Sequence, residues 1–543
     1  MLDISNVVIA LNNLGKDINK TLVKECAKRL KCDKTDIISV DIKRRSIDAR
    51  NKNKVSFIYT LQVEVKDEEA LVAKNPKNVR ISKDDRQDFA VVQDTTLDTE
   101  IVVVGAGCAG LFCALELAHA GLKPILIERG EPAYTRQDTI KAFNEGHALN
   151  CESNIQFGVG GAGTFSDGKL NTGTKSKAHR LILETFVKCG ASPEILYDAK
   201  PHIGSDVLPK VVTNICNEIE SLGGTVKTSC KLVDLVIENN KVAAIKTSTY
   251  CPDSSSYKEE TINTNCVVLA TGHSARDTYE MLYEHNVALE RKTFAMGVRI
   301  EHLQKDINKA QYGKKFAEHP ALGAAPYKLV NHLRDGRSSF SFCMCPGGYV
   351  VAATSEEGQV VTNGMSLSDR AGTNANSGLL VNVFPEDLEG DSPLAGIALQ
   401  RKYEKRAFDV GEGNYQAPTQ LVGDFLQNTP SSTMGSITPT YPRGCKWTSI
   451  DSCLPEYISE TLRASIPAMD RKLRGFAKSD AVLTAIESRS SSPVRITRDD
   501  NLMSLGLRGL WPAGEGAGYA GGIMSAATDG LRVADAVINH YKQ

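Results

Sequence analysis

The sequence predicts an α/β protein with a Rossmann-like nucleotide-binding domain, a mixed α+β domain inserted into it, and a small α/β module in front of it. The first observation is a glycine-rich turn that joins a short β-branched run directly to a helical pattern within residues 99–130. The second is that strand and glycine patterns of the same kind return at residues 265–276 and 511–530, far along the chain. The third is length, because 543 residues exceed what one hydrophobic core usually supports.

Residues 1–95 are predicted to form the small module. LVKECAKRLKC has helical periodicity, and KVSFIYTLQVEV alternates apolar and polar residues like a half-buried strand. The polar connector KNPKNVRISKDDRQD follows, which places a boundary between Asp94 and Asp98. We therefore expect three further segments: the first part of the nucleotide-binding domain at 96–291, the inserted domain at 292–494, and a C-terminal part at 495–543.

Residues 99–130, TEIVVVGAGCAGLFCALELAHAGLKPILIERG, have the order of a βαβ unit. The β-branched run at 101–104 predicts a buried strand, the stretch 111–120 predicts a helix, and PILIE predicts a second strand that ends in an acid. A parallel strand pair joined by a helix is the core of nucleotide-binding α/β domains.

Gly105, Gly107 and Gly110 form the pattern GxGxxG between this strand and helix. The first glycine permits a tight turn, the second lets the backbone approach a pyrophosphate, and the third lets helix and strand pack closely. The helix start adds unpaired N–H groups and the positive end of the helix dipole. Glu128, at the end of the second strand, is expected to accept hydrogen bonds from ribose hydroxyls and to disfavour a 2′-phosphate. NAD and FAD share this fingerprint, so it leaves the choice between them open.

Composition argues against several classes of function. A formal net charge of −1 gives no general attraction to nucleic acid. The start, MLDISNVVIALNNLG, lacks the features of a signal peptide, and no run approaches the roughly 20 apolar residues of a membrane span. The 14 cysteines have no small-scaffold spacing, which is typical of thiols in a reducing compartment. We therefore expect a soluble cytoplasmic protein with no membrane or nucleic-acid partner.

The motifs taken together resemble a known family. They are GAGCAGLFCALELA, GGAGTFSDGKLNTGTK, KPHIGSDVLPKVV, LATGHSARDTYEML, SFCMCPGG, ESRSSSPVRITRD and PAGEGAGYAGGIMSAATDG. This set spans nearly the whole chain and is similar to that of the bacterial family of uncharacterised FAD-dependent dehydrogenases, a branch of the glutathione-reductase-like flavoprotein superfamily. The resemblance implies a fold and FAD as the cofactor, but it implies no substrate.

The resemblance also implies where the chain meets FAD. The glycine cluster at 157–175 is expected to run past the pyrophosphate and the isoalloxazine ring, the segment near Val233 to lie against the adenine, and Glu515 to bond the ribitol chain. The start of the last helix is expected to present its amides to the N1/O2 edge of the flavin. The expected FAD contacts are Gly105, Ala106, Gly107, Cys108, Ala109, Gly110, Glu128, Arg129, Gly161, Gly163, Thr164, Ser166, Lys169, Val233, Ala270, Thr271, Gly272, Gly514, Glu515, Gly521, Gly522 and Ile523.

In flavoproteins of this superfamily, an insertion at the position of residues 292–494 forms the substrate domain and caps the flavin. Its most unusual feature is the pair Cys343 and Cys345, which strand alternation would place on one face. Packing against the flavin pocket is the favoured interpretation, with redox or substrate chemistry at Cys345 and metal binding as alternatives. No metal site is expected, because no second paired-cysteine motif exists.

Other candidates for a catalytic role are His273 and Lys169. His273 directly follows the Ala-Thr-Gly turn and could exchange a proton during hydride transfer, or it could be a hydrogen-bonded structural histidine. Lys169 could stabilise the reduced flavin or be a solvated loop lysine. Arg489, Arg495 and Arg498 could grip a carboxylate or phosphate, although surface salt bridges are the commoner role of such arginines.

The sequence therefore predicts an FAD-dependent oxidoreductase, a dehydrogenase or reductase, that moves a hydride between flavin N5 and a small organic substrate. The chain has no second strand-linked GxGxxG, so NAD(P)H is expected only as a transient electron donor. Two alternatives stay open. One is a flavoprotein that binds or modifies RNA through the basic stretches KRLKC, DIKRR and ARNKNK, and the other is a flavin monooxygenase.

Overall fold

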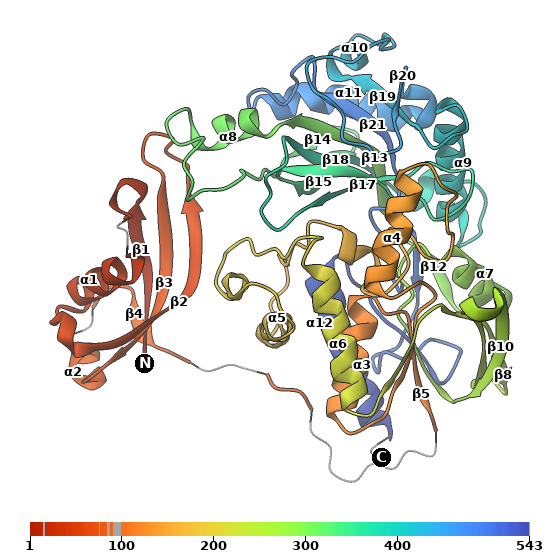
Figure 1. The fold of residues 1–543 in the computed structure, drawn as a ribbon, viewed down its shortest axis with the longest axis horizontal. Coiled ribbons are helices and arrows are strands. Elements are labelled where there is room, and N and C mark those ends of the chain that lie inside the picture. The colour runs from red at the N-terminus through yellow and green to blue at the C-terminus, as the bar shows by residue number, and fades with distance from the viewer. Residues whose placement is uncertain (15–16, 75, 84–86, 91–98, 542–543) are drawn as a thin grey trace.

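The computed structural model describes residues 1–14, 17–74, 76–83, 87–90 and 99–541. The predicted boundary between Asp94 and Asp98 lies outside the described residues. In Figure 1 the N-terminal module lies beside the rest of the chain, in which a parallel-sheet domain lies below a mixed-sheet domain.

The module is a four-stranded antiparallel sheet in the order β2-β3-β1-β4 with two helices. Its elements are β1 (Leu2–Ala10), α1 (Ile18–Leu30), β2 (Ile37–Asp48), β3 (Ser56–Val65), α2 (Glu68–Ala73) and β4 (Val79–Ile81). The predicted helix and strand correspond to α1 and β3. Leu22, Cys26 and Leu30 recur at every fourth position of α1 and are buried, as expected for the apolar stripe of a helix on a sheet.

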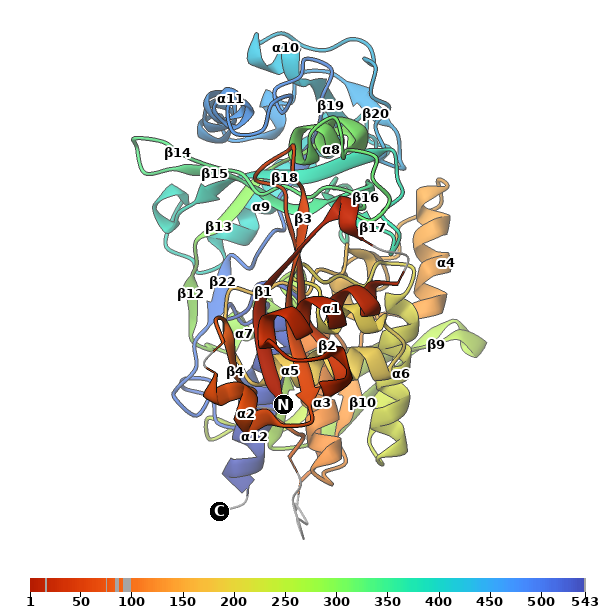
Figure 2. The same cartoon turned by 90° about the vertical axis from the view of Figure 1, so that its left-hand side faces the viewer.

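The module contacts the parallel-sheet domain through its edge strand β2. The Arg45 guanidinium donates to both carboxylate oxygens of Asp198, at 2.7 and 3.0 Å. The backbone continues the contact, because Arg45 N–H donates to Tyr197 O and Ala199 N–H donates to Arg45 O. Figure 2 shows the module in front of the parallel-sheet domain.

The parallel-sheet domain has five strands in the order β23-β11-β5-β6-β7, all parallel. They are β5 (Ile101–Val104), β6 (Ile125–Ile127), β7 (Thr225–Lys227), β11 (Cys266–Leu269) and β23 (Leu510–Pro512). Both faces are covered, since Ile101 and Val103 pack under helices while Val102 and Val104 pack against a second sheet. This arrangement explains why the strand is apolar at every position.

The helical face consists of α3 (Cys108–His119), α5 (Ala178–Lys188), α6 (Leu208–Ser221) and the last helix α12 (Ile523–Tyr541). Helices α3 and α12 cross closely, because a Cβ on Gly530 would lie 2.1 Å from Ala109 O. The opposite face carries an antiparallel sheet of β8 (Cys230–Glu238), β9 (Lys241–Cys251) and β10 (Ser256–Asn263). Figure 1 shows β8 and β10 on the side away from α3 and α12.

The mixed-sheet domain is built on seven strands in the order β14-β15-β18-β13-β21-β19-β20. These are β13 (Phe294–Leu303), β14 (Val330–His332), β15 (Ser338–Cys345), β18 (Asn374–Val383), β19 (Ala417–Leu421), β20 (Cys445–Trp447) and β21 (Val482–Glu487). A hairpin of β16 (Gly348–Ala352) and β17 (Thr362–Ser366) and a ladder of β12 (Leu289–Arg291) and β22 (Val494–Ile496) accompany it. Its helices are α8 (Gln304–Tyr312), α9 (Ala395–Val410), α10 (Val422–Leu426) and α11 (Glu456–Asp470). The remaining helices, α4 (Ala133–Asn144) and α7 (Arg276–Glu284), belong to the parallel-sheet domain.

A buried ion cluster joins the two domains. Glu404 on α9 accepts hydrogen bonds from Arg276 on α7 and from Arg489 after β21, and all three side chains are at most 1% exposed. Removal of one partner from such a cluster costs much folding free energy. The cluster therefore fixes the mixed-sheet domain over the parallel sheet. Within the described residues no helix is long and apolar enough to cross a membrane.

Candidate functional site

A cleft lies where the carboxyl ends of β5 and β11 face the mixed-sheet domain, which is where ligands bind in open α/β sheets. Both domains contribute to its wall. The lining residues predicted from sequence are Gly105, Gly107, Cys108, Ala109, Glu128, Arg129, Gly161, Gly163, Ser166, Lys169, Ala270, Thr271, Gly272, His273, Glu515, Gly521, Gly522 and Ile523.

The three glycines of the first loop have three different environments. Gly105 has a φ of +100°, and a Cβ there would lie 2.5 Å from Ala270 O. A Cβ on Gly110 would lie 1.8 Å from Gly105 O, so this glycine allows helix and strand to pack. Gly107 faces the cleft, since its Cβ would meet only Gly161 Cα, at 3.9 Å, among the described residues. Backbone can therefore approach a ligand at Gly107.

Glu128 fixes the loops around it. Its Oε2 accepts from Ala106 N–H at 2.8 Å, and its Oε1 accepts from Gly130 and Gly158 N–H at 2.9 Å each. Sequence reasoning assigned this carboxylate to ribose alone. The structure gives it a positioning role as well, and Glu128 also lines the cleft.

The second glycine loop is held by a residue that sequence reasoning missed. Arg136 on α4 is fully buried and donates to the backbone carbonyls of five residues. These are Asn154, Ile155, Gly158, Val159 and Gly161, at 2.7 to 3.2 Å. Burial lowers the pKa of this guanidinium to about 9. The sequence signal for the role of Arg136 was weak, because an arginine on a helix is ordinarily assigned to the surface.

The third segment is the start of α12. A Cβ on Gly521 or Gly522 would meet no described atom within 4 Å, and Gly522 has a φ of +124°. Both glycines therefore expose backbone to the cleft at the positive end of a helix. The preceding turn is set by Asp529, which accepts from Gly514 N–H at 2.8 Å and is paired with Arg498.

The side chains near the expected reaction centre are His273, Glu515 and Lys169. Burial, with Arg489 and Arg276 nearby, lowers the pKa of His273 to about 3, so its imidazole is neutral. Burial raises the pKa of Glu515 to about 7, and its Oε1 lies 3.9 Å from His273 Nε2. Lys169 Nζ is buried without a hydrogen-bond partner among the described residues. Its nearest carboxylate, Asp167, lies 3.5 Å away.

Several predicted contacts do not line the cleft. Thr164 is buried, with its hydroxyl bonded to Val159 O at 3.3 Å, and Val233 is 44% exposed while its neighbours Cys230, Lys231 and Leu232 form the wall. Ala106, Gly110 and Gly514 lie behind the lining residues.

The expectation for Cys345 also changes, because a bulge between Phe342 and Cys345 interrupts the alternation of β15. As a result Cys343 lines the cleft, while Cys345 is fully buried. Within the described residues no group of three His, Cys, Asp or Glu side chains could hold a metal ion.

The mixed-sheet domain also supplies cleft residues. Phe342 and Cys343 lie in the motif SFCMCPGG, Arg489 and Ser490 lie in ESRSSSPVRITRD, and only Asn363 lies outside the motifs quoted above. Arg489 is not free to grip a substrate, since it is bonded to Glu404, Ser355 and Gln359. In the parallel-sheet domain the missed residues include Gln156, Phe157, Asn171 and Lys231.

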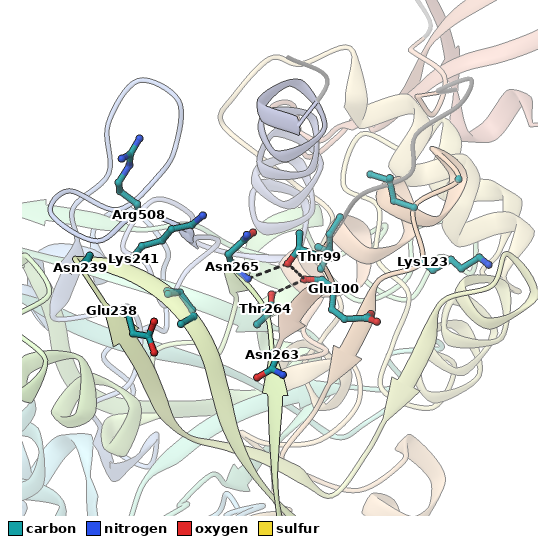
Figure 3. A pocket seen from close by; sticks show the side chains of 15 residues that line it. Thr99, Glu100, Lys123, Glu238, Asn239, Lys241, Asn263, Thr264, Asn265 and Arg508 are labelled. Atoms are coloured by element: carbon teal, nitrogen blue, oxygen red, sulfur yellow. Dashed lines mark hydrogen bonds between the residues drawn. The ribbon is translucent and has the colours of Figure 1, made fainter.

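A second hollow lies at the amino-terminal ends of β5 and β11 (Figure 3). Its labelled charges have both signs and are spread around the rim, with Arg508 and Lys241 on one side and Lys123 on the other. The hydrogen bonds there stay within the wall, from Thr264 Oγ1 to Glu100 O and from Asn265 N–H to Thr99 Oγ1. The arrangement presents no convergent polar groups, and we assign no site to it.

Comparison with known proteins finds three families along the chain. Residues 1–64 match a domain of unknown function, residues 99–294 match the pyridine nucleotide-disulphide oxidoreductase family, and residues 293–490 match the family described as FAD-dependent protein, C-terminal domain-like. A protein of Clostridium beijerinckii, described as uncharacterized, is 45% identical over 543 residues, which cover 98% of this chain and 99% of that protein.

Solved structures are similar only distantly. Glycerol-3-phosphate dehydrogenase from Bacillus halodurans, complexed with FAD, is 12% identical over 82% of this chain and 65% of its own, with a TM-score of 0.32. Glycine oxidase from Bacillus cereus is 11% identical over 82% of this chain and 96% of its own, with a TM-score of 0.30. Thermovibrio ammonificans THI4 is 17% identical over 36% of this chain and 66% of its own, with a TM-score of 0.23. Structural similarities this distant support no conclusion about the reaction.

The predicted Rossmann-like α/β fold and FAD as the cofactor are confirmed by the matching families, together with the class of FAD-dependent oxidoreductase domains. The narrower assignment to the glutathione-reductase-like branch stays a prediction. In this chain a pyridine nucleotide-disulphide oxidoreductase domain is followed by an FAD-dependent protein C-terminal domain, and the chain belongs to the family of the Clostridium beijerinckii protein.

Proposed function

We propose that this protein is an FAD-dependent dehydrogenase or reductase that transfers a hydride between flavin N5 and a small organic substrate held under the mixed-sheet domain. The observation that carries the proposal is the composition of the cleft. Three glycine-rich backbone segments, at Gly107, Gly161 and Gly522, line the same cleft as Phe342 and Asn363 of the other domain.

The residues present fit FAD. The open spaces beside Gly107, Gly272 and Gly521 are cradles that a Cβ would fill or narrow. The start of α3 offers N–H groups to a pyrophosphate, and Glu128 Oε2 retains a lone pair for a ribose hydroxyl. Lys231 and Leu232 line the same cleft and would supply the wall on the adenine side.

The side chains at the end of the cleft near the mixed-sheet domain can exchange protons and carry charge. When bound, FAD supplies a reversible hydride acceptor at N5. The neutral imidazole of His273 offers one N–H donor and one acceptor at neutral pH. Glu515, whose pKa is about 7, is the carboxyl group that gains or loses a proton near neutral pH. Lys169 Nζ adds a cation that favours negative charge on a bound group.

The mixed-sheet domain positions the substrate and excludes water. Phe342 gives an apolar surface, while the Asn363 amide is fixed by a 2.7 Å hydrogen bond from Arg299 Nη2 to its Oδ1. The cluster of Arg276, Glu404 and Arg489 keeps this wall in place. Exclusion of water strengthens every electrostatic interaction inside the site.

The test is to purify the full chain, record its flavin absorption spectrum, and mix it without oxygen with NADH or NADPH. We expect a flavin spectrum that bleaches with one of the two and returns when an electron acceptor is added. The cleft variant Gly107→Asp is the control, because it should lack flavin and show no bleaching. Protein that is colourless and takes up no added FAD contradicts the proposal. Oxygen consumption in step with NAD(P)H, with an oxygenated product, would replace it by the monooxygenase alternative.

A further inference from the structure

Three of the fourteen cysteines, all of which are described, line the cleft: Cys108, Cys230 and Cys343. Cys108 is the first residue of α3, and burial raises the pKa of its thiol to about 12. Cys343 has the opposite character. We propose that Cys343 is a nucleophilic thiolate with Lys169 as its counter-cation, and that it adds to an electron-poor carbon of the substrate, such as the β carbon of an α,β-unsaturated carbonyl. The covalent step rests on the proposed function, since the substrate must share the cleft.

The backbone at Cys343 is strained in a way that aims the side chain. Its φ is +38°, in the left-handed region that residues with a Cβ rarely adopt. The bulge places Cys343 and Met344 opposite one residue of β18, Ser377. Such outliers persist only where the surroundings enforce them.

Buried groups enforce this conformation. Arg299 Nη1 donates to Cys343 O at 2.9 Å, and Ser377 Oγ donates to Phe342 O at 3.1 Å. Arg299 is itself fully buried and paired with Glu487. The strained turn is therefore built on a fixed ion pair.

Two cations favour the thiolate. Lys169 Nζ lacks a hydrogen-bond partner among the described residues, and the carboxylate nearest to it, Asp167, already accepts from Arg370 Nε at 3.0 Å. Arg299 is the second cation. A hydrogen bond from Cys345 and the charges of Lys169 and Arg299 hold the pKa of Cys343 well below its usual value, against the effect of burial. Burial opposes the charge of Lys169, but Cys343, Cys345 and Asp167 raise its pKa.

The negative groups that face Cys343 are weak opponents. Asp167 is paired with Arg370 and Glu487 with Arg299, while burial raises the pKa of Glu515 to about 7, so that Glu515 is partly protonated at neutral pH. Cys345 is fully buried, its Sγ lies 3.2 Å from Cys343 O, and its own pKa is raised well above the usual value. Its thiol therefore stays protonated and donates to the Cys343 carbonyl.

The step balances without an added oxidant or reductant. A sulfur lone pair of Cys343 forms the C–S bond at the β carbon, and the π pair of the C=C bond moves to the α carbon. A proton from Lys169 Nζ neutralises that carbon and leaves a neutral amine. The reverse step restores the thiolate, the ammonium group and the alkene. Phe342, which is 36% exposed at the cleft, provides an apolar wall for the carbon skeleton.

The test compares alkylation of Cys343 with alkylation of Cys108 in the full chain as purified. Iodoacetamide and cyclohexenone are the probes, applied between pH 5 and 9, and labelled peptides are quantified by mass spectrometry. At pH 7 we expect Cys343 to react at least roughly tenfold faster than Cys108, because a thiolate and not a thiol is the nucleophile. Cys343→Ser should remove the cyclohexenone adduct.

Variants of Lys169 distinguish an effect of its charge on the Cys343 thiol from an effect of solvent exposure alone. Lys169→Met should raise the pH midpoint of Cys343 labelling by about one unit or more, Lys169→Arg should keep it near the wild-type value, and Lys175→Met, in the same loop but exposed, should leave it unchanged. Circular dichroism checks that each variant folds. Slow labelling of Cys343 with a midpoint above pH 8, or an unchanged midpoint in Lys169→Met, overturns the proposal. A yellow protein with an unreactive Cys343 refutes this inference alone, whereas a colourless protein with a reactive Cys343 keeps the ion pair and refutes the proposed function.

Discussion

The substitution Gly107→Asp tests the cofactor site with little effect on the fold. Gly107 has a φ of −75°, which any residue adopts, and the only described atom near an added Cβ is Gly161 Cα at 3.9 Å. The aspartate side chain would therefore enter the space between the two glycine loops without backbone strain. That space is where the pyrophosphate of a dinucleotide is expected.

The size of the expected loss of FAD affinity follows from charge repulsion. A carboxylate on Gly107 would lie on the order of 4 Å from a phosphate, and two unit charges at that distance repel by about 4 kcal/mol at an effective dielectric constant of 20. This energy corresponds to roughly a thousandfold loss of FAD affinity. Gly107→Ala adds no charge and should lose about tenfold or less.

The assay measures flavin content after purification and the affinity of the flavin-free protein for added FAD. Gly173→Asp is the matched control, because Gly173 lies in a neighbouring loop, has an ordinary φ, and has no described atom within 4 Å of an added Cβ. It adds the same charge at an exposed position outside the cleft. If Gly107→Asp retains FAD as well as Gly173→Asp does, the pyrophosphate is not at the first glycine loop and the reasoning is refuted.

Three further predictions concern buried charges. Arg136→Lys replaces five N–H donors by three, so the second glycine loop should loosen and FAD affinity should fall by about tenfold or more, as measured by flavin titration; an unchanged affinity would show that the loop keeps its form without the guanidinium. Glu404→Gln leaves Arg276 and Arg489 without their shared carboxylate and should lower the free energy of unfolding in urea by about 3–5 kcal/mol, and a change below about 1 kcal/mol would contradict the role of the cluster. Burial raises the pKa of Glu116 to about 7, so the native state keeps this proton longer than the unfolded chain and stability from this group is lost as pH rises from about 4.5 to 7. Between these pH values the free energy of unfolding, obtained from thermal unfolding, should fall by up to about 3 kcal/mol in the wild type and stay nearly constant in Glu116→Gln. A pH profile that is the same in both proteins would contradict this prediction.

The first glycine loop could be predicted because its signal is local. The turn at Gly105, the open face at Gly107 and the packing at Gly110 depend on residues that are adjacent in sequence, and βαβ geometry fixes the rest. The predicted strands β5 and β11 are present and lie side by side. The position of the start of α12 at the cleft follows from the same fold.

The remaining part of the site depends on long-range contacts that one sequence does not reveal. Arg136 meets its five carbonyls only because α4 folds back over the second glycine loop. Strand alternation alone predicted both sulfurs on one face, whereas the bulge leaves Cys343 at the cleft and Cys345 buried. No local pattern marks a position where an extra residue enters a ladder.

The arrangement of charges in the cleft limits how a substrate can be recognised. Arg489 and Arg129 both line the cleft, but Arg489 is bonded to Glu404, and Arg129 is bonded to Asp277 and Glu152. A ligand that took either arginine would leave a carboxylate without its partner, at a cost of about 3–5 kcal/mol for a buried one. Lys169 has no such hydrogen bond to lose among the described residues. An anionic group on the substrate therefore competes with the Cys343 thiolate for one cation, and its binding should raise the pH at which Cys343 becomes reactive.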